Sequence, residues 1–419
     1  MDIFKFGGAS VKDAAGVKNV VRVLNLTGAK EKVVVVSAMG KTTNALEGII
    51  HHYFNSKHQL PAAIQQLEDD HLQIVDQLFP KGHSIFERLK GLFAELKGFL
   101  AWNKSPNYDF VYDQVVCYGE LLSTAIVSAY LEHEQLKNTW LDARDLIKTD
   151  TSHRDAQVDW ELTKSRISAA IDKKGLTITQ GFIGSEPNNF STTLGREGSD
   201  YTAAIFAYCL DANQVTIWKD VAGVLNGDPR VFENTQLLHQ ISYEEAIELA
   251  FYGASVIHPK TLQPLQRKEI PLFVKSFLKP EDQGTAVSKG QRLVPEVPCF
   301  IVKKEQVLIS LSSLDFSFMV EDNIAEVFQL LSKYKMKVDL IQNSAISFSV
   351  CVNNKFNNLE VLVNTLKAKF KVSVTPNVSL YTIRHFDAQA LQSIEKQKKV
   401  LLKQVTQATV QLVAAEQGG

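Results

Sequence analysis

Short apolar runs rich in β-branched residues alternate with longer stretches of mixed polarity along residues 1–276. The strand-length runs cover 3–6, 32–36, 139–141, 176–179, 214–218 and 271–276. Between them, apolar residues recur at helical spacing, most clearly in 17–26, 44–103 and 115–133. Continuous β-branched runs are typical of strands buried on both faces, and helices commonly connect such strands. The pattern therefore predicts an α/β fold with a mostly parallel sheet sandwiched by helices.

The pattern changes after a polar segment that contains Pro280 and Gly284, and we place a linker at 279–296. Beyond it, strand-like runs occur at 299–303, 307–312, 337–341, 346–352, 378–383 and 400–413, and helical spacing at 323–334, 359–370 and 388–394. This order predicts two βαββ-type units, an α+β region with antiparallel sheets. The region gathers no set of catalytic residue types, so a regulatory or assembly module is expected, with structural filler as the alternative.

Composition excludes several classes of protein. The 419 residues carry a formal net charge of -1, which argues against general nucleic-acid binding. The four cysteines lie far apart, so neither a disulfide framework nor a zinc site is expected, and a reducing compartment is favoured. The first residues lack the pattern of a secretory signal, and the apolar runs have strand length, so no membrane span is expected. We expect a cytoplasmic protein.

One stretch, 192–204, concentrates residues suited to bind an anion. Gly195 and Gly198 permit tight turns and close approach of a ligand, and Arg196 presents a planar fork suited to a carboxylate or phosphate. Ser199 or Asp200 is expected to cap the following helix, whose free amides favour an anion. The alternative is an ordinary capped helix after a polar turn.

The first strand ends at Gly7-Gly8, with Lys5 as its one charge. A strand that leads through a glycine turn into a helix is typical of phosphate-binding loops. The motifs of Walker loops and of dinucleotide-binding folds are absent from the sequence. A surface lysine beside a tight turn is the alternative interpretation.

Two further segments add polar groups to this picture. The run 37–43, Ser-Ala-Met-Gly-Lys-Thr-Thr, follows a buried strand and forms a second candidate wall of the site. Glu120, preceded by Gly119, lies in an otherwise apolar helical stretch, where it could receive a substrate ammonium. Turn formation explains the first segment equally well, and a solvated helix face remains the alternative for the second.

Taken together and in order, these motifs resemble the aspartate kinase family of the amino-acid-kinase fold. The matching segments are Lys5-Phe6-Gly7-Gly8, Ser37-Ala38-Met39-Gly40, Gly119-Glu120, Gln180-Gly181-Phe182-Ile183-Gly184, Thr193-Leu194-Gly195-Arg196, Gly198-Ser199-Asp200-Tyr201, Asp228-Pro229-Arg230, Gly253-Ala254 and His258-Pro259. The resemblance implies a catalytic domain at 1–278 and a regulatory region at 297–419 with two ACT-type domains, one of them, 307–374, inserted between 297–306 and 375–419. No homoserine dehydrogenase, which is fused to some family members, is expected.

The resemblance implies transfer of the γ-phosphoryl group of ATP to the β-carboxylate of L-aspartate, the first step of lysine, threonine and methionine biosynthesis. Such transfer needs mainly positioning and charge neutralisation. On the acceptor side, Arg196 is expected to clamp the α-carboxylate and Glu120 to take the α-ammonium. Ser37, Thr43, Phe182 and Ser199 would complete that pocket.

On the nucleotide side, the resemblance implies that Lys5 bridges the transferring phosphoryl group and the acceptor carboxylate. Asp200 would orient Lys5, or water on Mg2+, and the metal would be held mainly by ATP and water. The remaining residues expected around ATP are Gly7, Gly8, Ser199, Lys219, Asp220 and Arg230.

Several positions depart from the family pattern, namely Ala9, Glu197, Lys219, the stretch Leu225-Asn226-Gly227, and Ser255. The family often has a lysine that reaches the phosphates where this chain has Ser255. We therefore hypothesise that Lys219 or Lys260 supplies the missing charge. Unchanged Michaelis constants for ATP in Lys219→Ala and Lys260→Ala would remove this hypothesis.

The C-terminal resemblance implies a homodimer with feedback control by lysine or threonine, the effector being left open. The segment 314–323 is longer than the usual effector loop, and Ala345 replaces a common acidic residue. Glu321, Asp322 or Asp339 could receive a lysine side chain instead. Two alternatives remain, a catalytically weak amino-acid sensor and a kinase for another small carboxylate. Glu120 together with Arg196 favours an α-amino acid as substrate.

Overall fold

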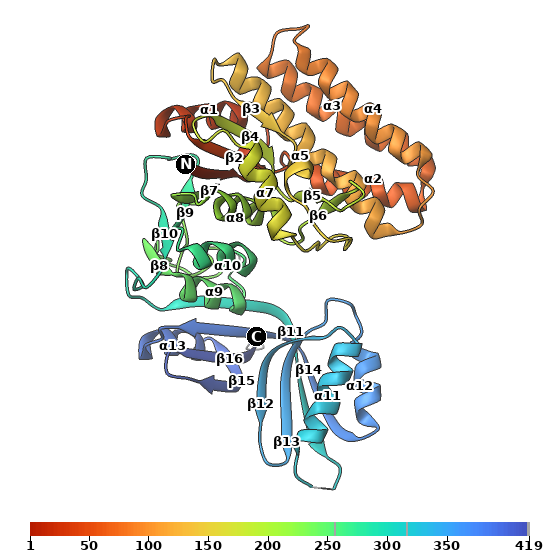
Figure 1. Cartoon of the computed structure of the whole chain (residues 1–419). Coiled ribbons are helices and arrows are strands. Elements are labelled where there is room, and N and C mark those ends of the chain that lie inside the picture. The colour runs from red at the N-terminus through yellow and green to blue at the C-terminus, as the bar shows by residue number, and fades with distance from the viewer. Residues whose placement is uncertain (255–256, 316, 417–419) are drawn as a thin grey trace. The chain divides into compact units, whose positions relative to one another are not determined.

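The computed structural model describes residues 1–254, 257–315 and 317–416, which fall into two compact units (Figure 1). The first unit comprises 1–224, 237–247 and 256–295, and the second comprises 225–236, 248–255 and 296–419. The segment expected as a linker, 279–296, carries a strand of the first unit's sheet, and only its last residue belongs to the second unit.

The first unit is built on an eight-stranded sheet with the strand order β3-β4-β2-β1-β7-β9-β10-β8. Its strands are β1 (Asp2–Phe6), β2 (Lys32–Val36), β3 (Thr139–Leu141), β4 (Leu176–Gln180), β7 (Gln214–Lys219), β8 (Gln240–Ser242), β9 (Leu272–Ser276) and β10 (Thr285–Ser288). Every pairing is parallel except that of β9 with β10. The predicted, mostly parallel sheet is confirmed, and the central strands β1 and β2 are buried along almost their whole length.

Helices cover both faces of this sheet, as the sequence predicts (Figure 1). The helices up to residue 268 are α1 (Ala14–Thr27), α2 (Thr42–Asn55), α3 (Leu60–Leu78), α4 (Ser84–Trp102), α5 (Tyr108–His133), α6 (Ala143–Leu146), α7 (Trp160–Ala170), α8 (Gly198–Leu210), α9 (Tyr243–Tyr252) and α10 (Pro259–Lys268). Asp13, Asn107 and Asp159 begin three of them by accepting hydrogen bonds from backbone amides of the first turn. These caps are local, yet the predicted helices at 17–26 and 115–133 begin three and seven residues after α1 and α5 do, and no helix was delimited over α7.

Helix α5 is the long apolar core helix of the first unit. It is the one helix of the described residues that is long and apolar enough to cross a membrane, and 94% of the window concerned is buried inside the protein. A helix that is apolar on all sides is expected in the core of a large domain, because every face must then be covered. Figure 1 shows α5 among neighbouring helices beside the sheet. The helix predicted at 115–133 is therefore confirmed and begins earlier, at Tyr108, whereas the expectation that apolar runs have only strand length is wrong for it.

The second unit contains a six-stranded antiparallel sheet with the strand order β12-β13-β11-β14-β16-β15. Its strands are β11 (Cys299–Ser313), β12 (Lys337–Asn343), β13 (Ser347–Asn353), β14 (Phe370–Arg384), β15 (Lys398–Val405) and β16 (Thr409–Glu416), and its helices are α11 (Glu321–Lys333), α12 (Leu359–Lys367) and α13 (Ala388–Glu395). Separate apolar clusters lie under α11 with α12 and under α13. Two α+β halves therefore share one continuous sheet.

The sequence pattern predicted two separate strands, 299–303 and 307–312, where the structure has the single strand β11. The register of β11 against β14 shifts between Lys303 and Leu308, and Glu305 adopts a positive φ of 57°. A bulge of this kind lets a strand continue through a polar, irregular stretch. The polar residues that suggested a gap are therefore the bulge of a long strand.

Candidate active site

A cavity of about 360 Å³ lies in the first unit at the carboxyl ends of the adjacent strands β4, β2, β1 and β7. Ligands of open α/β sheets bind at this edge, as the sequence-based interpretation assumed. The described residues that line the cavity are Lys5, Gly8, Ser37, Ala38, Gly40, Thr43, Glu120, Phe182, Gly195, Glu197, Gly198, Ser199, Asp200 and Lys219. The cavity thus gathers segments that are far apart in the sequence.

Asp200, in the first turn of α8, holds two lysines at the cavity wall. Lys5 Nζ lies 2.6 Å from Asp200 Oδ1, and the two side chains are only 10% and 4% exposed. Lys219 Nζ lies 3.8 Å from Asp200 Oδ2, with 24% of its side chain exposed. A carboxylate withdrawn from water is tolerated only where cations compensate it. The trio carries a net formal charge of +1, which suits an anionic ligand.

Glu120, on α5, faces the same cavity and is 3% exposed. Its Oε1 accepts a hydrogen bond from the Ala38 amide at 3.3 Å, while its buried Oε2 finds no partner among the described residues. Burial raises the pKa of the Glu120 carboxyl to about 8, although the Ala38 amide and Lys5 both oppose the shift. An unpartnered buried carboxyl is a favourable acceptor for an incoming cation, because the ligand supplies the missing partner.

The start of α8 differs from the sequence-based expectation. The residue before the helix is Glu197, which adopts a left-handed conformation with φ of 53° and makes no capping bond through its side chain. Ser199 and Asp200 lie inside the first turn, so the prediction that one of them caps the helix is wrong. Asp200 binds Lys5 instead, since a buried ion pair takes precedence over a local cap. Glu197 lines the cavity, and its departure from the family pattern was the one sequence signal that could have identified it.

Gly181, Phe182 and Gly198 pack the two walls of the cavity closely together. Phe182 has a φ of 71°, and its amide donates a hydrogen bond to Thr202 Oγ1 at 2.9 Å. A Cβ at Gly198 would lie 2.6 Å from Phe182 Cδ2, and a Cβ at Gly181 would lie 2.5 Å from Ser199 Cβ. Glycine is therefore required at both positions by the close approach of α8 to the turn after β4.

Gly181→Ala should loosen this wall, because its added methyl group has no space beside Ser199. We expect a loss of about 2 kcal/mol in the free energy of unfolding and a fall of at least about tenfold in kcat as Asp200 is displaced. Urea unfolding and steady-state kinetics measure the two effects. Gly48→Ala on α2 is the matched control, because a Cβ there meets nothing within 4 Å and alanine favours a helix. Equal behaviour of the two variants would contradict the packing argument.

Some predicted site residues do not line the cavity. Arg196 and Asp220 are exposed, and the turn residue Gly7 lies near Lys5, since a Cβ at Gly7 would lie 3.5 Å from Lys5 Nζ. Arg230 belongs to the second unit, where it is exposed and paired with Asp228 at 2.7 Å. The structure does not test the ligand roles of these four residues, which remain predictions.

The positions of the two lysines favour one of them in the hypothesis about a replacement lysine, which stays a prediction. Lys219 lines the cavity on Asp200, whereas Lys260, on α10, forms an ion pair with Asp155 and is outside the set of described lining residues. Lys219 is therefore the better-placed candidate. Ser255, whose substitution prompted the hypothesis, lies outside the residues that the structure describes.

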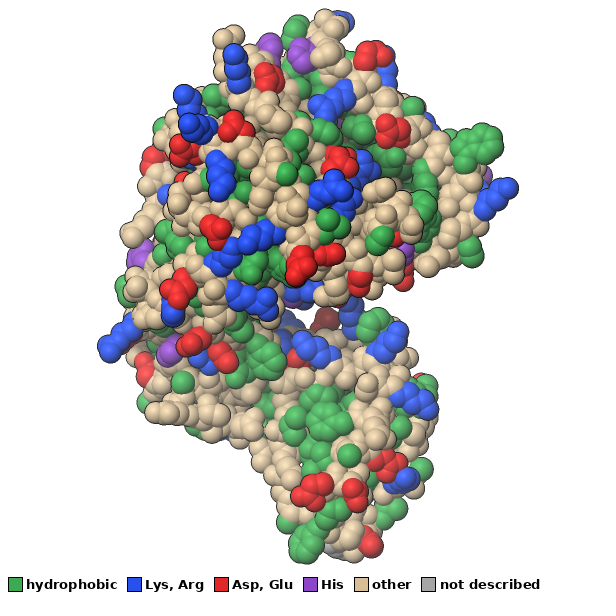
Figure 2. Space-filling view, in the orientation of Figure 1, with side chains coloured by type: hydrophobic (Ala, Val, Ile, Leu, Met, Phe, Trp, Pro, Cys, Tyr) green, Lys and Arg blue, Asp and Glu red, His purple; other side chains and the backbone are tan. Residues whose placement is uncertain are grey.

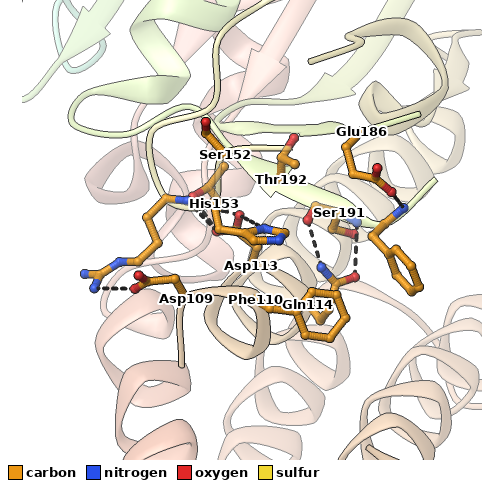
Figure 3. A network of polar contacts seen from close by, with 12 residues as sticks. Asp109, Phe110, Asp113, Gln114, Ser152, His153, Glu186, Ser191 and Thr192 are labelled. Carbon is orange, nitrogen blue, oxygen red and sulfur yellow. Dashed lines mark hydrogen bonds and ion pairs between the residues drawn. The ribbon is translucent and has the colours of Figure 1, made fainter. Parts of the chain in front are cut away.

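A buried polar network supports the turn that leads to Gly195 (Figure 3). Asp113 of α5 is fully buried and pairs with His153 Nδ1 at 2.9 Å. It also accepts hydrogen bonds from Thr193 Oγ1 at 2.7 Å and from the Arg154 amide at 3.1 Å. Thr193 belongs to β6 (Ser191–Thr193), which pairs with β5 (Ile183–Ser185). The network ties α5, two turns before Glu120, to the strand that enters the 192–204 stretch.

Asp113→Ala should lower the free energy of unfolding by about 3 kcal/mol, because several buried donors lose their acceptor together. Urea unfolding followed by tryptophan fluorescence measures the change. Asp109→Ala is the control, since Asp109 forms only an exposed pair with Arg154 at 3.2 Å, and its loss should change stability by at most about 0.5 kcal/mol. A stability loss for Asp113→Ala no larger than that of the control would contradict the role assigned to the network.

The fold and the site together define a member of a known kinase class. The profile of the Amino acid kinase family matches residues 3–276. The chain therefore belongs to the amino acid kinase family, in agreement with the resemblance inferred from its motifs. The matched range covers all the strands that surround the cavity.

Several similar proteins are aspartokinases, and this chain belongs to that branch of the family. Lysine-sensitive aspartokinase 3 of Escherichia coli (strain K12) is 34% identical over 358 residues, which cover 84% of this chain and 78% of the relative. The structure of E. coli aspartokinase III with aspartate and ADP matches with a TM-score of 0.81 at 27% identity, covering 99% of this chain and 96% of that one. Its complex with lysine and aspartate matches with a TM-score of 0.82 at 28% identity, covering 99% and 95%. The chain spans 44% of the length of a bifunctional aspartokinase/homoserine dehydrogenase of Arabidopsis thaliana.

Proposed function

We propose that this chain transfers the γ-phosphoryl group of ATP to the β-carboxylate of L-aspartate and forms 4-phospho-L-aspartate. One observation carries the proposal. A single cavity holds two lysines that form ion pairs with Asp200, and also the Glu120 carboxyl, whose Oε2 has no partner among the described residues. The lysines suit the phosphoryl and carboxylate anions, and Glu120 suits the substrate ammonium. Similarity to a structure that holds aspartate and ADP supports the same reaction. The product would enter lysine, threonine and methionine biosynthesis.

The reaction balances without net proton transfer. The bond from the γ-phosphorus to its bridging oxygen breaks, a bond to a β-carboxylate oxygen forms, and ADP leaves with the electron pair. Side chains are therefore required to align two anions and to neutralise charge rather than to move protons. In this proposal Lys5 lies between donor and acceptor, and Ser37, Thr43 and Phe182 form the acceptor wall. Arg196 would meet the α-carboxylate from the rim.

We propose that Mg2+ enters with the nucleotide. In the described ranges, no group of three or more His, Cys, Asp or Glu side chains is arranged to hold a metal ion. Mg2+ commonly keeps several waters and binds through substrate phosphates with few protein carboxylates, and Asp200 at the cavity wall suits contact through water. The metal would neutralise phosphate charge beside Lys5.

We further propose that the second unit is a pair of ACT-type domains that bind an effector, with lysine favoured because the similar E. coli protein is lysine-sensitive. Asp339 is the least suitable of the candidate acids, since Lys303 already pairs with it at 2.7 Å and its side chain is 5% exposed. Glu321 and Asp322, which begin α11, are exposed and accessible to a ligand ammonium.

A homodimer in a reducing, cytoplasmic setting completes the proposal. Figure 2 shows hydrophobic side chains at the surface of the second unit. The exposed large hydrophobic residues of this unit include Leu314, Phe318, Ile341 and Ile346. Exposed apolar groups in such number support an interface between copies of the chain. The four cysteines are buried and form no disulfide, which supports a reducing compartment.

The test is acyl-phosphate formation, trapped with hydroxylamine, from the purified full chain with ATP, Mg2+ and L-aspartate. We expect product with aspartate and little with L-glutamate, and inhibition by lysine. Asp200→Asn serves as the inactive control. Absence of product with aspartate, while lysine or threonine still binds, would overturn the kinase proposal and favour an amino-acid sensor.

A further inference from the structure

Lys219 occupies a backbone position that is fixed from two sides. It ends β7, whose register against β1 pairs Trp218 with Phe6, so that Lys219 follows directly opposite the Gly7-Gly8 turn. On the other side, Lys219 pairs with Ser276 of β9, and its carbonyl accepts a hydrogen bond from the Phe277 amide at 3.0 Å. Buried Trp218 stacks on Phe6 with an interplanar angle of 10°. The backbone of Lys219 is therefore held in place by both neighbouring strands, beside the Gly7-Gly8 turn.

The side chain points to the cavity because Asp200 attracts it. The two oxygens of this one carboxylate face different lysines, Oδ1 facing Lys5 and Oδ2 facing Lys219. Lys5 at 2.6 Å already supplies a close counter-ion to Asp200. A second lysine at 3.8 Å adds little to that stabilisation and gives these three side chains a surplus of one positive charge, in a cavity whose lining also includes Glu120 and Glu197. This surplus fits a ligand group that gains negative charge there.

We propose that Lys219 is a catalytic residue that contacts the γ-phosphoryl group during transfer, with Asp200 as the shared anchor of Lys219 and Lys5. The inference rests on the proposed kinase function and assigns a role within it. As the bond to the ADP oxygen breaks and the bond to the carboxylate oxygen forms, charge spreads over the phosphoryl oxygens. Two ammonium groups held by one carboxylate stabilise that charge from fixed positions, without moving a proton.

The first experiment compares Lys219→Met, which keeps length and removes charge, with Lys219→Arg, which keeps the charge. We expect Lys219→Met to lower kcat by about a hundredfold with little change in the Michaelis constant for aspartate, and Lys219→Arg to recover part of the loss. Lys90→Met is the matched control, since Lys90 forms an exposed ion pair with Glu87 on α4, and its kinetics should equal those of the wild type. Melting temperatures verify that each variant folds.

A binding measurement separates catalysis from simple nucleotide affinity. Tryptophan fluorescence, with Trp218 adjacent to the site, follows binding of ADP alone and of ADP with aluminium fluoride and aspartate, a mimic of the phosphoryl group in transfer. Lys219→Met should weaken the mimic complex by about a hundredfold and ADP alone far less. If Lys219→Met weakened the ADP complex as much as the mimic complex, Lys219 would serve only to bind the nucleotide, and the catalytic assignment would be overturned.

The outcomes for this inference and for the proposed function are distinct. A wild-type chain that forms no aspartyl phosphate overturns both. An active wild type with an equally active Lys219→Met variant overturns the assignment of Lys219 alone. An active wild type whose Lys219→Met variant loses kcat and binding of the mimic supports it.

Discussion

Replacing Lys5 with methionine should lower kcat by about a thousandfold, the largest effect that we expect from any single substitution. Lys5 is the more buried of the two lysines on Asp200, and its Nζ faces the cavity beside the glycine turn. Methionine preserves the length of the side chain and removes its charge, so donor and acceptor anions would meet without a neutralising group between them. Single-turnover formation of the hydroxamate from aspartate and ATP measures this loss directly.

The same substitution should also destabilise the first unit, and the two effects can be separated. Without Lys5, the buried Asp200 carboxylate keeps Lys219 only at 3.8 Å, and we expect a loss of about 3 kcal/mol in the free energy of unfolding. The double variant Lys5→Met with Asp200→Asn removes the uncompensated charge, so its stability should return toward that of the wild type. Its activity should stay as low as that of Lys5→Met.

Kinetic and stability data for the double variant decide between two roles of Lys5. Recovery of stability without activity would show that the ammonium group itself is required for the reaction. Recovery of activity together with stability would contradict the assignment, because Lys5 would then serve only to balance Asp200. Lys12→Met is a suitable control, since Lys12 is exposed and its loss should leave both quantities unchanged.

Much of the first unit could be predicted because its signals are local. The run Val33–Val36 is a continuous β-branched strand, and the glycine turn after Phe6 interrupts another, so each strand end is visible in the sequence. In an α/β sheet the ends of parallel strands meet at one edge. That rule pointed to the segment 37–43, while the glycine turn pointed to Lys5 and the family resemblance to Phe182; Lys5, Ser37 and Phe182 all line the cavity.

The features that were missed depend on contacts between distant parts of the chain. Asp200 was expected as a possible helix cap and, through the family resemblance, as a residue that orients Lys5; the structure has the ion pair, 195 positions apart, and not the cap. Glu197 was seen only as a departure from a pattern, because its left-handed backbone and place in the cavity follow from the close packing of Gly198 on Phe182. Strand β11 was divided in two because a polar bulge and a loop are alike in composition. Spacing alone contains none of this information.

Glu120→Gln should lower kcat/KM for aspartate by at least about a hundredfold and remove a pH dependence that the wild type shows. Burial raises the pKa of Glu120 to about 8, so the empty site holds a neutral carboxyl at neutral pH. An ammonium group binds well only to the carboxylate, and binding must therefore release the proton. Wild-type kcat/KM for aspartate should rise about tenfold per pH unit up to about pH 8 and then level off.

In the ligand-free protein, the free energy of unfolding should fall as pH rises, whereas kcat/KM for aspartate rises. Because the folded-state pKa of Glu120 lies above the ordinary value of 4.5, the folded chain keeps a proton that the unfolded chain releases. Stability is thus lost as pH rises from about 4.5 to about 8, by on the order of 4 kcal/mol in total from this group. Glu120→Gln abolishes that loss, so above pH 8 the variant should unfold at higher urea concentration than the wild type.

Glu120→Gln is thus expected to lower kcat/KM and to raise stability above pH 8. A general defect in folding would instead lower activity and stability together. Glutamine retains an oxygen for the Ala38 amide, so the hydrogen bond at 3.3 Å can persist while the titrating group is lost. Calorimetry in buffers of different ionisation enthalpy should find proton release on aspartate binding for the wild type and none for Glu120→Gln. A wild-type profile that is flat below pH 8, or proton release that survives in the variant, would assign the substrate ammonium to a different acceptor.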